Sequence, residues 1–126
     1  MRTDSFVLYG LSKYESIIDK IIEDIRCHDN YFDVKLILTE ALTNAFNHGN
    51  KKDDEKPIYL RYEYECQDRY VKFEIEDSGD IARNIVMSRE LSDDNILNNS
   101  GRGLFLINCI ADEVYFQENT IVIQKN

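Results

Sequence analysis

Residues 38–49, with the sequence LTEALTNAFNHG, determine the fold of this chain. At about 100° per residue one face of this segment is apolar, which predicts an amphipathic helix from Asp33 to His48. Asp33 is a suitable N-cap residue, and Gly49 ends the helix. The predicted buried stripe consists of Val34, Ile37, Leu38, Ala41, Leu42 and Ala45.

Polar residues lie beside the apolar face of this helix. Glu40, Asn44 and Asn47 follow one another at i, i+4 and i+7, and His48 lies at the edge of the same row. Oxygen ligands of this kind suit Mg²⁺, and a carboxylate beside the metal can accept a proton from an attacking hydroxyl. The row is a candidate metal and base site. A solvated helix flank with a capping Asn is the alternative explanation.

A charged residue also interrupts the pattern of a predicted strand. Over residues 71–75 the odd positions are apolar and the even positions charged, so the alternation turns Asp77 toward the core side. An unpartnered carboxylate is costly there, and the exocyclic amine of a bound base is one suitable partner. The alternative is that the strand ends at Glu76 and that Asp77 begins a turn toward Gly79.

A glycine-containing turn precedes the third predicted helix. Residues 99–103, NSGRG, lead into a helix that starts near Arg102. Two glycines at a helix start let backbone N–H groups approach phosphate oxygens, the helix dipole favours an anion, and Arg102 adds a cation. A plain tight turn explains the same motif without any ligand.

The remaining sequence supplies a sheet and one more helix. An apolar stripe after Ser12, a candidate N-cap with Glu15 three residues later, predicts the first helix. Strands are predicted at 6–9, 58–66, 71–75, 113–117 and 120–124, the middle two and the last two forming hairpins. A mixed, mostly antiparallel sheet with three helices on one face is an α+β two-layer sandwich, expected as a single domain over residues 1–126. The long polar connection at 80–100 is typical of a functional lid or a disordered segment.

The composition narrows the function classes. Among the 126 residues, 24 are acidic and 15 basic, and the formal net charge of −9 disfavours binding to nucleic acid and to anionic lipid. No apolar run approaches the ~20 residues of a membrane-spanning helix, and the first residues lack a signal-peptide core, so a cytoplasmic protein is expected. Cys27, Cys66 and Cys109 lack CxxC spacing and are expected to be reduced and mostly buried.

Taken together, these motifs resemble the nucleotide-binding boxes of the GHKL ATPase superfamily, most closely those of its anti-sigma-factor serine kinases. Residues 38–49 resemble the N box, residues 77–80 (DSGD) the G1 box, and residues 100–107 (SGRGLFLI) the G2 box. The resemblance covers almost the whole chain. It implies a Bergerat-type ATP-binding fold that holds Mg²⁺ and ATP under a lid at residues 80–100. Ile81 departs from the fuller DxGxG pattern of the G1 box, whose last position is glycine.

The resemblance also implies a role for each matching position. Glu40 resembles the general base, Asn44 the Mg²⁺ ligand, and Asp77 the residue that hydrogen-bonds the adenine amino group. Gly79 resembles the glycine that allows the base to approach closely. The remaining positions expected at the nucleotide are Gly101 and Gly103 of the phosphate-binding turn, together with Asn47, His48, Arg102 and Leu104.

The function implied by the resemblance is that of an ATP-dependent serine/threonine-protein kinase. Such kinases transfer the γ-phosphoryl group to a Ser or Thr of a STAS-domain antagonist protein, and many sequester a sigma factor and so regulate transcription. Several are homodimers, and the apolar edge at residues 6–9 is a candidate surface for a second copy. Two alternatives stay open, namely a non-catalytic binding module gated by nucleotide and an α+β domain that binds no nucleotide.

Overall fold

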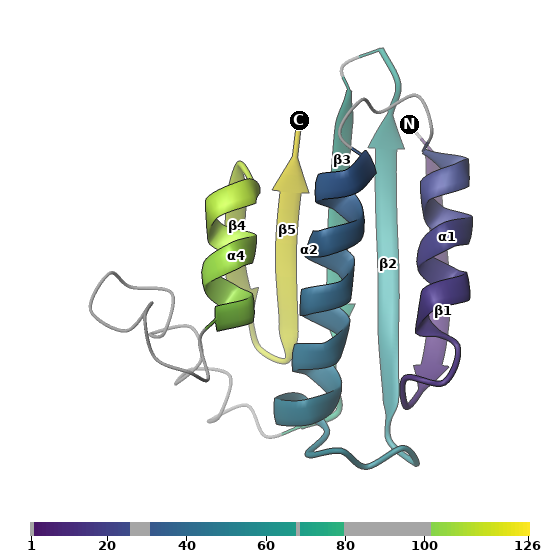
Figure 1. Ribbon diagram of the computed structural model, residues 1–126, viewed down its shortest axis with the longest axis vertical. Coiled ribbons are helices and arrows are strands. Elements are labelled where there is room, and N and C mark those ends of the chain that lie inside the picture. The colour runs from purple at the N-terminus through teal and green to yellow at the C-terminus, as the bar shows by residue number, and fades with distance from the viewer. Residues whose placement is uncertain (1, 26–30, 68, 80–101) are drawn as a thin grey trace.

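A five-stranded sheet with helices on one face makes up the described part of the computed structural model, residues 2–25, 31–67, 69–79 and 102–126 (Figure 1). The strands are β1 (Arg2–Tyr9), β2 (Pro57–Glu65), β3 (Tyr70–Glu76), β4 (Glu113–Gln117) and β5 (Thr120–Lys125). The helices are α1 (Tyr14–Asp24), α2 (Tyr31–Asn44), the π-helix η1 (Ala45–Gly49) and α4 (Arg102–Ile110). The expected α+β two-layer arrangement is confirmed.

The strand order is β1-β2-β3-β5-β4, and every pairing between the described strands is antiparallel. Both predicted hairpins form, β2 with β3 and β4 with β5. The pairing of β3 with β5 joins the two hairpins and sets Glu76 opposite Thr120. The end of β3 therefore lies beside the tip of the β4–β5 hairpin.

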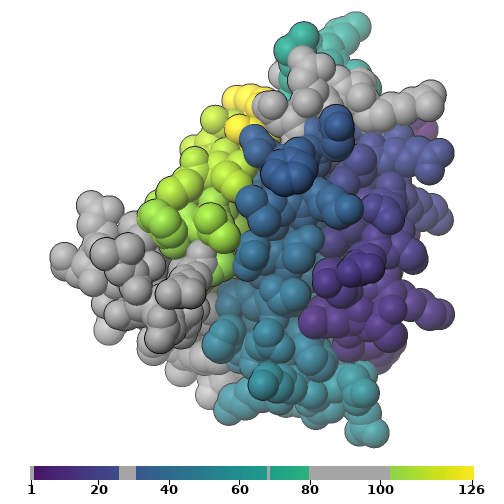
Figure 2. Space-filling model, in the orientation of Figure 1, coloured from purple at the N-terminus to yellow at the C-terminus, as the bar shows by residue number. Residues whose placement is uncertain are grey.

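The core lies between the sheet and the helical layer. Alternate residues of β2 and β3, among them Leu60 and Phe73, point toward the helices and are fully buried. The predicted stripe of α2 is confirmed, since Val34, Ile37, Leu38, Ala41, Leu42 and Ala45 are all buried. Figure 2 shows α2 in the middle of the helical face, with α1 on one side and α4 on the other. Each large apolar side chain buried in this way contributes about 1.5–3 kcal/mol.

Several predicted boundaries are wrong. Ser12 does not cap the first helix, which starts at Tyr14 with Lys13 at the N-cap position and no side-chain cap. Asp33 lies in the first turn of α2, because that helix already begins at Tyr31. The first strand begins at Arg2 rather than Phe6, because it pairs with β2 along its whole length.

The cysteine expectation is also wrong. Cys66 is disulfide-bonded and Cys109 is a free thiol, and both side chains are exposed rather than buried. Cys27, the predicted lid at 80–100, Ile81 and Gly101 lie outside the described residues. Among the described helices, none is long and apolar enough to cross a membrane.

Candidate functional site

The C-terminal end of α2 carries the first part of the site. The α-helix continues only to Asn44, and a π turn follows in which the Asn50 N–H donates to the Ala45 carbonyl at 2.8 Å. A π turn is wider than an α turn and often occurs at functional sites. The predicted row of polar residues is therefore interrupted after Asn44, because the positions that follow no longer keep α-helical spacing.

Glu40 and Asn44 keep the predicted relationship, one α-helical turn apart and partly buried. Within the described part of the chain, neither side chain has a hydrogen-bond or ion-pair partner. Asn47 and His48 lie in the π turn and are exposed, so the structure does not align them with that pair. A carboxylate and an amide on one helix face can bind a hard cation together with phosphate oxygens and water.

Asp77 forms the second part of the site. β3 ends at Glu76, yet the Asp77 side chain is still buried, with 6% of its surface exposed. Each of the two alternatives derived from the sequence is thus partly right, since the strand has ended and the carboxylate nevertheless points inward. Asp77 Oδ1 accepts a hydrogen bond from the Gly79 N–H at 2.8 Å, and the Asp77 N–H donates to the Asn119 carbonyl at 3.0 Å.

Two glycines create the space in which the Asp77 turn sits. A Cβ on Gly49 would overlap the Asp77 carboxylate, and a Cβ on Gly79 would overlap the carbonyl oxygen of Gly49. The backbone of Gly49 is therefore packed against both the Asp77 side chain and the Gly79 backbone. This close approach brings the polar end of α2 and the buried carboxylate into one site.

Gly49 is a site residue that the sequence-based reasoning missed. Its sequence position is that of a helix C-cap, and the helical segment does end there. A glycine at such a cap usually adopts a positive φ. Among the described glycines, however, only Gly10 has a positive φ. Position 49 requires glycine because there is no space for a side chain, and the sequence alone does not reveal which group packs against it.

α4 supplies the third part of the site. A Cβ on Gly103 would lie 2.8 Å from Oε2 of Glu40, so the first turn of α4 faces the Glu40 carboxylate. Arg102 begins this helix. Leu104 is fully buried in the core, so only its backbone can contribute to a ligand site. A helix N-terminus with a glycine in its first turn suits an anion, because backbone N–H groups there lack intrahelical partners.

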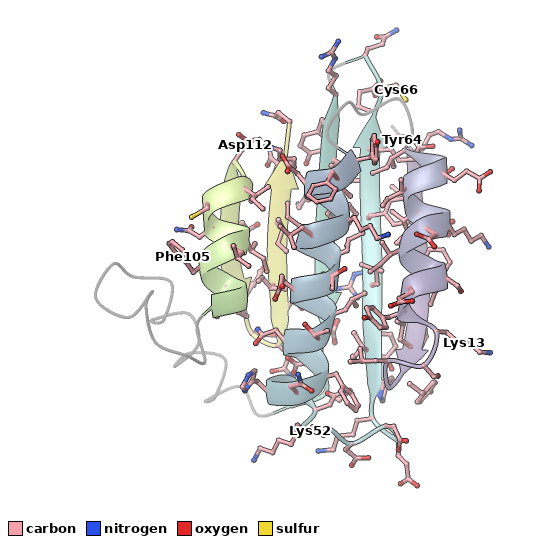
Figure 3. All side chains as sticks on the ribbon, viewed as in Figure 1. Lys13, Lys52, Tyr64, Cys66, Phe105 and Asp112 are labelled. Carbon is pink, nitrogen blue, oxygen red and sulfur yellow. The ribbon has the colours of Figure 1, made fainter. Side chains whose placement is uncertain are left out.

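The three parts come from segments far apart in the sequence but lie at one end of the helical layer. Figure 3 shows Lys52 just beyond this end of α2, whereas Tyr64 and Cys66 lie at the opposite end of the sheet. Among the described residues, no group of three or more His, Cys, Asp or Glu side chains forms a metal cluster. A metal at Glu40 and Asn44 would therefore need phosphate oxygens or water to complete its ligands.

Comparison with known proteins identifies the family. Residues 12–125 match the family model described as the histidine kinase-like ATPase domain. Because this match spans most of the chain, the protein belongs to that family. The expected GHKL relationship, with ATP as the ligand of such domains, is thereby confirmed.

The chain is also similar to an anti-sigma factor and to a serine-protein kinase. The anti-sigma F factor of Clostridium perfringens is 28% identical over 128 residues, which cover 97% of this chain and 86% of that protein. The serine-protein kinase RsbW of Staphylococcus aureus is 32% identical over 103 residues, which cover 76% of this chain and 64% of that protein.

Proposed function

We propose that this chain is an ATP-binding serine/threonine-protein kinase of the anti-sigma-factor type. It transfers the γ-phosphoryl group of ATP to a Ser or Thr hydroxyl of a STAS-domain antagonist protein. The observation that carries the proposal is the close packing of one helical segment against two others: Glu40 lies against the first turn of α4, and Gly49, at the end of the same segment, lies against the buried Asp77. Membership of the ATPase family and the names of the two similar proteins support it.

In this proposal the Asp77 turn recognises adenine. The Asp77 carboxylate accepts a hydrogen bond from the exocyclic amino group of the base, and the negative charge of the acceptor strengthens this bond in a site shielded from water. Gly79 is proposed to lie near the base, and its lack of a side chain lets the turn pack against the Gly49 carbonyl. Guanine carries a carbonyl oxygen where adenine has the amino group, so a carboxylate at this place repels it.

In this proposal the N-terminus of α4 binds the triphosphate. The backbone N–H groups of Arg102, Gly103 and Leu104, in its first turn, have no intrahelical carbonyl to donate to and suit an anion, and Gly101 is proposed to join them. The donor set of Glu40 and Asn44 fits Mg²⁺, and Asn44 is the proposed ligand. Asn47 and His48, on the π turn that follows, are proposed to lie near the nucleotide. When bound, Mg²⁺ neutralises charge on the phosphate oxygens.

Glu40 acts on the protein substrate. Its carboxylate orients the incoming Ser or Thr hydroxyl and accepts its proton as the oxygen bonds to the γ-phosphorus. The bond between the γ-phosphorus and the bridging oxygen breaks, which leaves ADP. Because Glu40 lies against Gly103, its carboxylate is close to the turn proposed to bind the phosphates.

The Glu40→Gln variant tests this assignment. The amide has the same shape but cannot accept the proton, so the variant should bind Mg-ATP like the parent and lose at least about 100-fold in the rate of phosphoryl transfer. Transfer is measured with labelled ATP and a purified STAS-domain protein. Glu55→Gln, on an exposed loop, is the matched control. Unchanged transfer by Glu40→Gln would refute the assignment. If the parent protein binds the STAS-domain protein but transfers no phosphoryl group to it, the nucleotide-gated binding module is favoured instead.

The cellular setting completes the proposal. The protein acts in the cytoplasm, sequesters a sigma factor until its antagonist intervenes, and pairs with a second copy through β1, an edge strand of the sheet. Val7 and Tyr9 are the exposed apolar residues of that edge. Co-purification with a sigma factor, with and without the antagonist, tests the partner assignment, and light scattering tests the pairing.

A further inference from the structure

The Asp77–Gly79 turn follows the last residue of β3 and is held by one backbone hydrogen bond and by two hydrogen bonds to side chains. All three of its backbone N–H groups have hydrogen-bond acceptors. The Asp77 N–H donates to the Asn119 carbonyl at 3.0 Å, the Ser78 N–H to Asn50 Oδ1 at 2.7 Å, and the Gly79 N–H to Asp77 Oδ1 at 2.8 Å. The geometry of the turn therefore depends on two asparagines that lie far from it in the sequence.

Asn50 ties the turn to the start of β2. The residue is completely buried, and its Nδ2 donates to the Lys56 carbonyl at 2.9 Å and to the Pro57 carbonyl at 3.3 Å. The Ser78 hydroxyl donates to the same Pro57 carbonyl at 2.8 Å. A buried network whose members all have partners is rigid, because each alternative arrangement leaves a polar group without one.

Asn119 ties the turn to the tip of the β4–β5 hairpin. Its Nδ2 donates to the Gly79 carbonyl at 3.0 Å, while its own carbonyl accepts from the Asp77 N–H. The residue is only partly buried. It can therefore be changed with less damage to the core than Asn50.

We propose that Asn50 and Asn119 are positioning residues for base recognition, which hold the Asp77 turn so that its carboxylate meets the amino group of adenine. The inference rests on the proposed function, because it requires that Asp77 contact the base. Neither asparagine touches the base itself. Each acts through the turn, which is organised before the nucleotide arrives and loses little further freedom on binding.

Asn119→Asp is the deciding variant. It keeps the shape and turn preference of Asn119 but removes the donor to the Gly79 carbonyl. Affinities for ATP and for inosine triphosphate, which lacks the amino group, are measured by calorimetry with Mg²⁺ present. In the parent we expect ATP to bind at least about tenfold more tightly than inosine triphosphate, because inosine carries a carbonyl oxygen in place of the amino group that donates to the carboxylate. In the variant this ratio should fall to within about twofold of unity.

The ratio separates positioning from general damage. Both nucleotides carry the same triphosphate, so a weakened phosphate site or a loss of stability affects them equally. Gln117→Ala, an exposed change in the same hairpin, should keep the parent ratio. Asn50→Ala should lower the ratio as well if the variant folds, and Asn119→Asp decides the question if it does not.

The outcomes distinguish a failure of the proposed function from a failure of the positioning role of the two asparagines. If the parent itself does not prefer ATP over inosine triphosphate, the role of Asp77 in the proposed function is wrong, and the positioning inference fails with it. If the parent shows the preference and Asn119→Asp retains it, the proposed function stands and the inference is overturned. The same holds if Asn119→Asp weakens both nucleotides by the same factor.

Discussion

The contact between Gly49 and Asp77 permits a quantitative test of the site. In Gly49→Ala the added Cβ would lie within 2.6 Å of three atoms of the Asp77 side chain, Oδ2, Cγ and Cβ. Carbon and oxygen atoms at rest are about 3.5 Å apart, so the turn must move by about 1 Å. Overpacking of this kind costs about 1–3 kcal/mol, and the reduced freedom of the unfolded chain returns less than about 1 kcal/mol.

Two measurements follow from this displacement. We expect the free energy of unfolding of Gly49→Ala, measured in urea, to fall by about 1–2 kcal/mol. For a chain of this size the melting temperature then falls by roughly 4–8 °C. The affinity for ATP should fall by at least about tenfold, because the Asp77 carboxylate is displaced from the base.

Gly103→Ala is the matched control for stability. Its added Cβ would meet only Oε2 of Glu40, the end of a flexible side chain, which can turn away. Since Gly103 lies in α4 and alanine favours helix, the stability of this variant should be unchanged or higher by up to about 1 kcal/mol. A Gly49→Ala protein with the parent's stability and ATP affinity would refute the packing on which the site is built.

Three further predictions address the metal, the core and the response to pH. Asn44→Ala should raise the Mg²⁺ concentration for half-maximal transfer by about tenfold or more, and an unchanged value in a metal titration would exclude this ligand. Phe73→Ala should lose about 3–5 kcal/mol in urea unfolding, because Phe73 is fully buried, whereas a loss below about 1 kcal/mol would contradict the core described above. Burial, together with the hydrogen bond from its hydroxyl to Asp24 Oδ2, raises the pKa of Tyr62. The unfolded chain therefore loses the Tyr62 proton near pH ~10, while the folded chain keeps it. The contribution of Tyr62 to the free energy of unfolding is complete below that pH and is lost as the pH rises further. Tyr62→Phe should consequently lose less stability than the parent between about pH 9 and 11, and equal losses would show that Tyr62 is not responsible.

Several elements could be predicted from the sequence because their cause is local. The periodic apolar residues of α1 and α2 specify which face of each helix is buried, and the alternation in β2 and β3 does the same for the sheet. The inward direction of Asp77 follows from this alternation even though the strand ends one residue before it. The spacing of Glu40 and Asn44 likewise survives in the structure, because both lie in the α-helical part of α2.

Other features could not be predicted, because they depend on segments that lie far away in the sequence. The polar first half of β1 carries no strand pattern, and its strand conformation comes from pairing with β2. The π turn after Asn44 moves Asn47 and His48 off the predicted row, and no periodicity distinguishes it from an α turn. The disulfide at Cys66 is not evident from the sequence either, because cysteine spacing alone does not show which thiols pair.

The amino-acid order by itself determined the layers of this protein, the residues that face its core, and three motifs with the chemistry to bind a nucleotide, because hydrophobic periodicity and motif spacing are properties of neighbouring residues. Only the tertiary structure decided that Gly49 must lack a side chain and that Asn50 and Asn119 hold the Asp77 turn. Those roles arise from the Asp77 side chain and from backbone atoms of segments that the pairing of β3 with β5 and the packing of α2 on the sheet bring together.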